Sequence, residues 1–172
     1  KKGMGINGAL LTLRKRREHA EQGTLLPSLA RNWSVSDDGL VYDFQLRNDV
    51  QFHHSADFTP SRKLDAQDVL FSFQRMLDPN HPWHAVAASG YPHAQSMQWP
   101  SLIAKIEAPD AHSVRITLTR RDATFLATLS MGFASIYSAE YAAKLLADGT
   151  PEAKSALADA VDALLGVALQ DC

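Results

Sequence analysis

Cysteine is nearly absent from the sequence, and its only example, Cys172, stands at the last position. A single cysteine forms no internal disulfide, and this one has no neighbouring base that would favour a thiolate. Long apolar runs are missing as well. The run from Ala9 to Leu11 is too short for the apolar core of a signal peptide, and no segment approaches the ~18 residues of a membrane span. We expect neither an export signal nor a membrane-spanning helix here.

An excess of charge of one sign is also lacking. Seventeen lysines and arginines stand against 19 acidic residues, which gives a formal net charge of -2. Such a chain has no overall field that would hold it to nucleic acid or to anionic lipid. The basic residues gather only near the start, at Lys1, Lys2 and 14–17, and short charged runs of this kind are usually solvated surface. We therefore expect no nucleic-acid partner.

Motifs of catalysis, metal binding and phosphate binding are missing too. The seven histidines are scattered, and they show neither HExxH nor a Cys/His zinc spacing. The adjacent pair His53 and His54 would point to opposite faces of a strand. No GxSxG, GxxxxGK[ST] or GxGxxG is present. The sequence thus predicts a protein that is not an enzyme and that has no resident metal or cofactor.

The sequence does contain two segments with the period of β-hairpins. Its composition, 45% apolar and 21% charged, is that of a folded globular domain. Apolar and polar residues alternate over 33–46 on both sides of the turn signal Asp37-Asp38-Gly39, and again over 103–118 around the turn at 109–112. The alternation continues through Val50 and Phe52, where we expect a further short extended piece. Each hairpin is expected to bury one face.

Helical patterns surround these hairpins. Residues 65–77 predict a helix with Asp65 as N-cap, one apolar face, and a stop at Asp78-Pro79. Further helices are predicted from Asp122 to Gly132, from Ser138 to Leu146 and from Thr150 onward, with a short extended piece at 134–137. The first 25 residues show weak helical character. This order of elements predicts an α+β fold, an antiparallel sheet of hairpins with helices on one face.

The stretch 81–100 has no sustained period but contains three large aromatic residues, Trp83, Tyr91 and Trp99. Loops of this length usually serve a purpose. The aromatic side chains either bind a ligand or pack as a small core under the loop, and packing is the more frequent outcome. Both alternatives remain open from the residues alone.

Several stretches also carry a family signature, in order along the chain. They are 27–30 (Pro-Ser-Leu-Ala), 33–36 (Trp-Ser-Val-Ser), 42–47, 65–69 with 71–75, 80–84, 114–118 and 138–141. This series resembles the family 5 bacterial extracellular solute-binding proteins over about residues 24–153. It is most similar to the periplasmic dipeptide-binding, oligopeptide-binding and Sap-type antimicrobial-peptide-binding proteins of ABC transporters.

The resemblance implies part of the first lobe of a type II periplasmic-binding-protein fold. It implies a periplasmic substrate-binding component that captures di- and oligopeptides, or cationic antimicrobial peptides, and delivers them to ABC permease subunits. Tyr91 is the one residue that it assigns to the ligand. Two segments depart from the family, a basic N-terminal segment at 1–23 and a C-terminal helix at 154–172. A truncated or frame-disrupted copy, acting only as a structural or interaction domain, is the alternative.

Overall fold

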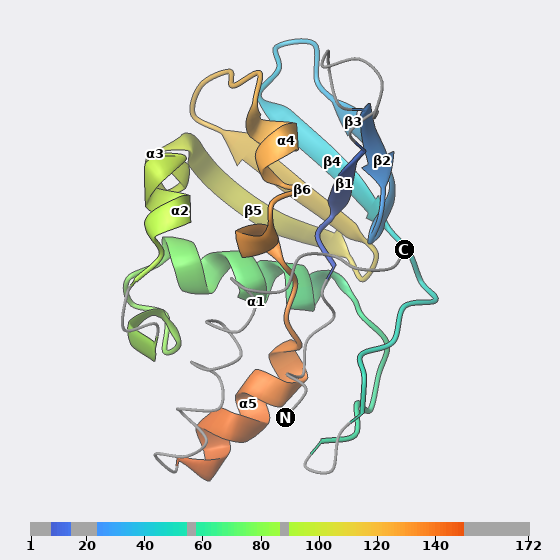
Figure 1. Ribbon diagram of the computed structural model, residues 1–172, viewed down its shortest axis with the longest axis vertical. Coiled ribbons are helices and arrows are strands. Elements are labelled where there is room, and N and C mark those ends of the chain that lie inside the picture. The colour runs from blue at the N-terminus through green and yellow to red at the C-terminus, as the bar shows by residue number, and fades with distance from the viewer. Residues whose placement is uncertain (1–7, 15–23, 55–57, 87–89, 150–172) are drawn as a thin grey trace.

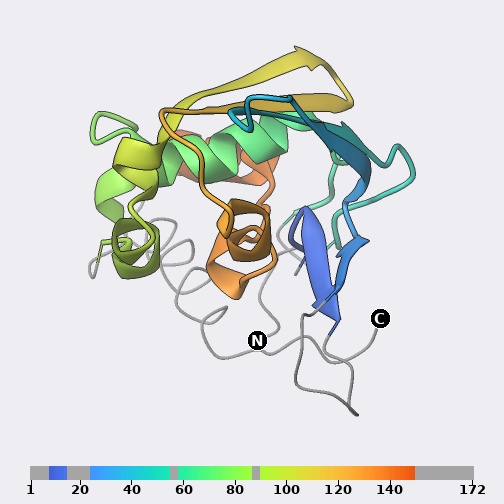
Figure 2. The same cartoon turned by 90° about the horizontal axis from the view of Figure 1, so that it is seen from above.

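The computed structural model describes residues 8–14, 24–54, 58–86 and 90–149 (Figure 1). A four-stranded sheet has helices on one of its faces, and a separate two-stranded hairpin lies beside it. Figure 2 shows the sheet along its edge, with α1, the later helices and the small hairpin all on the same side. This arrangement confirms the predicted α+β class, with an antiparallel sheet of hairpins covered on one face.

The four-stranded sheet is made of the two predicted hairpins. Strands β3 (Ala30–Val35) and β4 (Val41–Leu46) form the first, and β5 (Ile103–Asp110) and β6 (Ser113–Leu118) form the second. All pairs are antiparallel in the order β3-β4-β6-β5, so β4 and β6 are central. Residues 50–52, expected to be extended, belong to no described strand.

The register of the central strands separates an apolar face from a polar one. Phe44 pairs with Val114, and both side chains are buried. Asp43 pairs with Arg115 on the opposite face, where the Arg115 Nε and Nη2 atoms donate to the Asp43 carboxylate at 2.7 and 3.0 Å. Because side chains alternate along a strand, the whole sheet has one buried and one solvated face.

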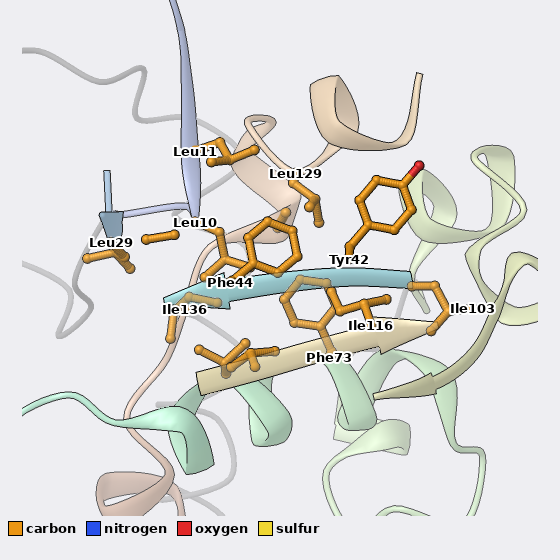
Figure 3. Close-up of a cluster of buried hydrophobic side chains, with 14 of the residues drawn as sticks. Leu10, Leu11, Leu29, Tyr42, Phe44, Phe73, Ile103, Ile116, Leu129 and Ile136 are labelled. Carbon is orange, nitrogen blue, oxygen red and sulfur yellow. The ribbon is translucent and has the colours of Figure 1, made fainter. Parts of the chain in front are cut away.

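Helix α1 (Ala66–Leu77) covers part of the buried face. It begins as predicted at Asp65, whose carboxylate accepts from Gln67 N at 2.8 Å, while the Asp68 carboxylate accepts from Asp65 N at 3.0 Å. This reciprocal pair is a capping box. The buried Phe73 of α1 reaches the sheet beside Ile116 (Figure 3).

Three short helices lie in the described parts of the segment 81–102. They are η1 (His84–Val86), α2 (Pro92–Ser96) and α3 (Trp99–Leu102). Trp83, Tyr91 and Trp99 are all buried, at 3%, 8% and 0% exposure. The Trp99 ring stacks on Phe73 with centroids 5.2 Å apart. In this structure, therefore, all three aromatic side chains pack inside the protein.

Three more helical elements follow β6. They are α4 (Phe125–Thr128), η2 (Gly132–Ala134) and α5 (Ala139–Asp148). Helix α4 is shorter than predicted, because Gly132 starts a new 3-10 turn instead of ending the helix. The piece at 134–137 was expected to be extended, but it begins inside that turn, and Ile136 N donates to Gly8 O at 3.1 Å. The helix predicted from Thr150 lies outside the described residues.

The predicted cap of α5 is present, since Ser138 Oγ accepts from Tyr141 N at 3.1 Å. We expect Ser138→Ala to lower the free energy of unfolding by about 1 kcal/mol, the usual effect of losing an N-cap oxygen. Denaturant titration would measure the change. The matched control is Ser96→Ala, because the exposed Ser96 hydroxyl donates to His93 O and caps no helix start. Equal effects of the two variants would contradict the capping role.

The prediction of weak helical character near the N-terminus is wrong for residues 11–14. Strand β1 (Leu11–Arg14) pairs antiparallel with β2 (Thr24–Pro27). Leu10 and Leu11 are fully buried and point toward the core beside Leu29 and Phe44 (Figure 3). A tertiary partner has overridden the local helical preference.

Most of the apolar residues on the inward faces of the predicted hairpins and helices are buried. These are Tyr42, Phe44, Leu46, Val69, Phe73, Val114, Ile116, Leu118, Phe125 and Leu129. Trp33, Leu77 and Ile106 pack against this core while partly exposed, and Leu70 is half-buried. The residues with intermediate burial lie on the edge strands β3 and β5 or on the flank of α1, where fewer neighbours cover them.

Candidate functional site

An arginine and several aromatic residues meet where α1 ends. Arg75 lies in the last turn of α1, and Tyr91 is the N-cap of α2. Trp83 and His84 lie at the start of η1, and Tyr137 directly precedes the cap of α5. We call these five residues the Arg75 cluster. Figure 1 shows the elements that supply them, with α1 between α2 and α5.

Arg75 is held mainly by aromatic rings. Its side chain is only 3% exposed. The guanidinium carbon lies 4.4 Å from the centroid of the Tyr137 ring and 5.4 Å from that of Tyr91. Nη1 donates a long hydrogen bond of 3.4 Å to Tyr91 Oη, and the buried Nε has no hydrogen-bond partner. Cation–π contacts of this kind are favourable, but they supply no acceptor for the Nε–H group in the guanidinium plane.

No acidic side chain neutralises this cation within the part of the chain that the structure describes. The ion pairs found there involve Arg47, Arg62, Lys105 and Arg115, and none involves Arg75. Buried charges in proteins are normally paired with an opposite charge. The Arg75 cluster therefore contains a buried cation that has no ion-pair partner among the described residues.

Tyr91, the residue that the family resemblance assigns to the ligand, belongs to this cluster. Its hydroxyl donates to Trp83 O at 3.2 Å, and its ring lies 5.3 Å from the His84 ring. His84 Nδ1 in turn lies 2.8 Å from Arg75 O, at the end of α1. The structure thus brings Tyr91 and Trp83 together, while Trp99 lies apart on Phe73. The role of Tyr91 toward a ligand stays a prediction.

Burial shifts the proton affinities of two groups around Arg75. It raises the pKa of Tyr137 above its ordinary value, against the opposing influence of the Arg75 charge. Burial also lowers the pKa of His81, which Arg75 lowers further and Asp78 opposes. Tyr137 and His81 are therefore neutral near pH 7.

A hollow lies at the other end of α1. It has a volume of about 400 Å³ and is lined by Gln51, Phe52, His54 and 59–63. The Arg62 side chain that lines it already has an ion-pair partner, since Nη1 and Nη2 donate to the Asp68 carboxylate at 2.7 and 2.9 Å. This hollow contains no unpaired buried charge of the kind seen at Arg75, so the Arg75 cluster is the better candidate.

The remaining histidines form no metal site in the described segments, where no group of three or more histidine, cysteine or acidic side chains is placed to hold an ion. His53, His54 and His93 are exposed. The same described segments contain no helix long and apolar enough to cross a membrane.

The sequence analysis missed Arg75 and Tyr137, although a signal for the first was present. Asp68, Ser72 and Arg75 follow the i, i+4, i+7 spacing of one helix side, and all three are buried. We call them the polar stripe of α1. Asp68 Oδ1 accepts from Ala139 N at 2.8 Å, Ser72 Oγ accepts from Tyr137 N at 2.8 Å, and Arg75 contacts the Tyr137 ring. Charged residues within an apolar helical face mark such a contact.

Comparison with known proteins places most of the chain in a single family model. The model is described as bacterial extracellular solute-binding proteins, family 5 middle, and it matches residues 24–160. The probable di/tripeptide-binding protein 5 of Pseudomonas aeruginosa is 65% identical over 133 residues, which are 77% of this chain and 25% of the relative. The heme-binding protein A of Haemophilus influenzae is 54% identical over 126 residues, 73% of this chain and 23% of the relative.

A solved structure of a related binding protein also matches most of this chain. The dipeptide-binding protein of Pseudoalteromonas sp. SM9913, crystallised in complex with Met-Leu, superposes with a TM-score of 0.76 at 35% identity. The superposition covers 86% of this chain and 28% of that protein. The chain therefore spans about a quarter of the length of the proteins that it matches.

Proposed function

Because the chain belongs to the family 5 bacterial extracellular solute-binding proteins, we propose that it forms part of the peptide-capturing component of an ABC importer. Its fold is a partial domain of the type II periplasmic binding proteins, as the family resemblance implied. The family consists of binding proteins and not of enzymes. The proposed location is the periplasm, and the proposed partners are a peptide and the permease subunits that receive it.

The observation that carries this proposal is the 65% identity to a probable di/tripeptide-binding protein over 133 residues. Peptide as the ligand class also agrees with the Met-Leu complex of the superposed protein. The Arg75 cluster supplies groups suited to such a ligand, namely one cation and flat aromatic surfaces. Cationic antimicrobial peptides, the other predicted ligands, suit a site that contains a cation less well.

Heme is a second candidate ligand, because the heme-binding protein A of Haemophilus influenzae is 54% identical over 126 residues. The alternative of a purely structural domain predicts that neither ligand binds. Parallel titrations with dipeptides, tripeptides and hemin separate the three outcomes. Peptide binding supports the proposal, a shifted hemin absorption band supports the second candidate, and no binding at all supports the structural alternative.

We predict that this chain alone binds di- and tripeptides with a dissociation constant no tighter than about millimolar. A ligand enclosed from both sides has its polar groups paired, whereas an open half-site leaves them in water. The entropic cost of association, roughly 4 to 15 kcal/mol, must then be offset by a fraction of the contacts. Tryptophan fluorescence and calorimetry would measure the affinity.

The variant that tests Tyr91 in the same titrations is Tyr91→Phe, which removes the hydroxyl and keeps the ring. Tyr91→Ala removes the whole side chain. Micromolar binding that is lost in Tyr91→Ala would contradict the prediction, because it would make this chain a self-sufficient receptor.

A further inference from the structure

We infer that His81 is a pH-sensitive switch, whose neutral imidazole holds the main chain of Trp83 in place and whose protonation releases it. The basis is one hydrogen bond with a direction that chemistry fixes. Trp83 N donates to His81 Nδ1 at 3.2 Å, and a backbone N–H group can only donate. Nδ1 is therefore the unprotonated nitrogen, and the neutral ring carries its proton on Nε2.

Protonation of the ring reverses the role of Nδ1. The imidazolium has an N–H donor at both nitrogens, so Nδ1 no longer accepts. Two N–H groups then face each other, and the Trp83 N–H group loses this acceptor. His81 is half-buried and thus within reach of protons from the solvent, whereas Trp83 is only 3% exposed. A change at an accessible ring is thereby transmitted to a buried residue.

Contacts that do not depend on pH keep the His81 ring beside Trp83. His81 N donates to Asp78 O at 3.0 Å, and His84 N donates to His81 O at 2.8 Å. The ring itself lies against Phe71 of α1, with the two centroids 5.6 Å apart. Because these contacts fix the turn, the bond to Trp83 N is the contact of the ring that protonation removes directly.

Trp83 connects this switch to two other parts of the protein. Its carbonyl oxygen accepts from Tyr91 Oη at 3.2 Å, so the position of Tyr91 depends on the Trp83 main chain. Its side chain packs in a second, smaller apolar cluster, together with Phe58, Tyr141, Ala142 and Leu145. Release of Trp83 therefore loosens both the support of Tyr91 and the packing around α5.

The titratable and charged groups that face His81 lie at the end of α1 and the start of η1. Burial lowers the pKa of His81, Asp78 opposes this shift, and Arg75 and His84 add to it. The unfolded chain, in which a histidine has a pKa of about 6.5, thus binds the proton more readily than the folded chain. The stabilisation by neutral His81 is therefore complete above about pH 6.5 and is lost as the pH falls through the folded pKa.

The experiment follows the ring and the amide together. The ¹⁵N-labelled full chain would be titrated from about pH 8 to about pH 4, with the His81 ring nitrogens and the Trp83 amide observed by NMR. We expect both to change with one midpoint, below the pKa of an ordinary histidine. The protection factor of the Trp83 amide in hydrogen exchange should fall roughly 3-fold to 10-fold across this midpoint, as the loss of one hydrogen bond predicts.

The decisive variant is His81→Asn. An asparagine Oδ1 accepts from the N–H group two residues later, as Nδ1 does here, and it does not titrate. The variant should keep the Trp83 amide protected and abolish its pH step, whereas His81→Ala should show the lower protection factor already at pH 8. The matched control is His53→Asn, which changes an exposed histidine and should leave the step as it is in the unmodified chain.

Two results would overturn the switch. One is a Trp83 amide that titrates equally in His81→Asn and in the unmodified chain, since another group then causes the change. The other is a proton on Nδ1 of the unmodified chain at pH 8, read from the ring ¹⁵N shifts, and this measurement decides the question even if the variants do not fold. No ligand is needed in either case, so the proposed peptide-binding function stands or falls separately.

Discussion

Asp68→Ala is expected to lower the free energy of unfolding by about 3 kcal/mol, because it removes a buried charged acceptor that several donors share. Asp68 is 0% exposed. Its two oxygens accept from Arg62 Nη1 and Nη2 at 2.7 and 2.9 Å, from Asp65 N at 3.0 Å and from Ala139 N at 2.8 Å. Removal of the carboxylate leaves Asp65 N and Ala139 N without this acceptor, while Arg62 Nη1 keeps its bond of 3.0 Å to Lys63 O.

The effect should be structural as well as energetic, because the four bonds join three parts of the chain. They connect the loop before α1, the first turn of α1 and the first turn of α5. Denaturant titration would measure the loss. The control is Asp43→Ala, which removes the exposed partner of Arg115 and is expected to have a far smaller effect. Similar losses in the two variants would contradict the central role of Asp68.

Phe73→Ala is expected to be comparably severe, with a loss of roughly 3 to 5 kcal/mol from lost burial and from the cavity left behind. Phe73 is 0% exposed, and its ring stacks on Trp99 at an interplanar angle of 9°. It also lies beside Ile116 of the central strand β6 (Figure 3). Its removal opens a gap between the sheet, α1 and α3, where the neighbouring rings have little room to collapse.

Thermal and denaturant unfolding of Phe73→Ala would measure this loss. Leu146→Ala is a suitable control, since Leu146 is 45% exposed on α5 and its truncation is expected to change the free energy of unfolding by less than about 0.5 kcal/mol. A loss below about 1 kcal/mol in Phe73→Ala would show that the site repacks freely, contrary to the close packing seen here.

Elements that depend on short-range patterns were predictable from the sequence. The β4 strand shows strict alternation of buried Tyr42, Phe44 and Leu46 with half-buried neighbours, and α1 has both a capping carboxylate and an apolar face. In these segments the local preference and the tertiary environment agree. The cap of α5 at Ser138 follows the same logic.

Elements that depend on distant partners were not predictable. Strand β1 exists because β2 lies alongside it, and Leu10 and Leu11 alone show no period that separates strand from helix. The end of α4 was misplaced for a related reason. Gly132 permits a helix end, but the chain uses it to begin another turn.

The candidate site was predicted only in part. Tyr91 was predicted as a ligand residue through family resemblance, and the structure shows that Arg75 contacts it. Arg75 was not recognised because a single charge in an amphipathic helix is usually read as solvent-facing. The residues around Arg75 lie in three separate segments of the chain. No local sequence pattern shows that these segments come together in the folded protein. Tyr137 in particular reaches Arg75 from 62 positions later in the chain, a separation visible only in the folded protein.

The polar stripe of α1 has a consequence for how this scaffold can diverge. The Ser72 hydroxyl and the Asp68 carboxylate accept hydrogen bonds from the backbone N–H groups of residues 137 and 139, respectively, and not from their side chains. Any amino acid that retains an N–H can therefore occupy these positions without losing the anchor, and proline alone is excluded by chemistry. A change of the buried Tyr137 ring therefore alters its packing on Arg75 without removing the hydrogen bond that anchors the main chain at this position.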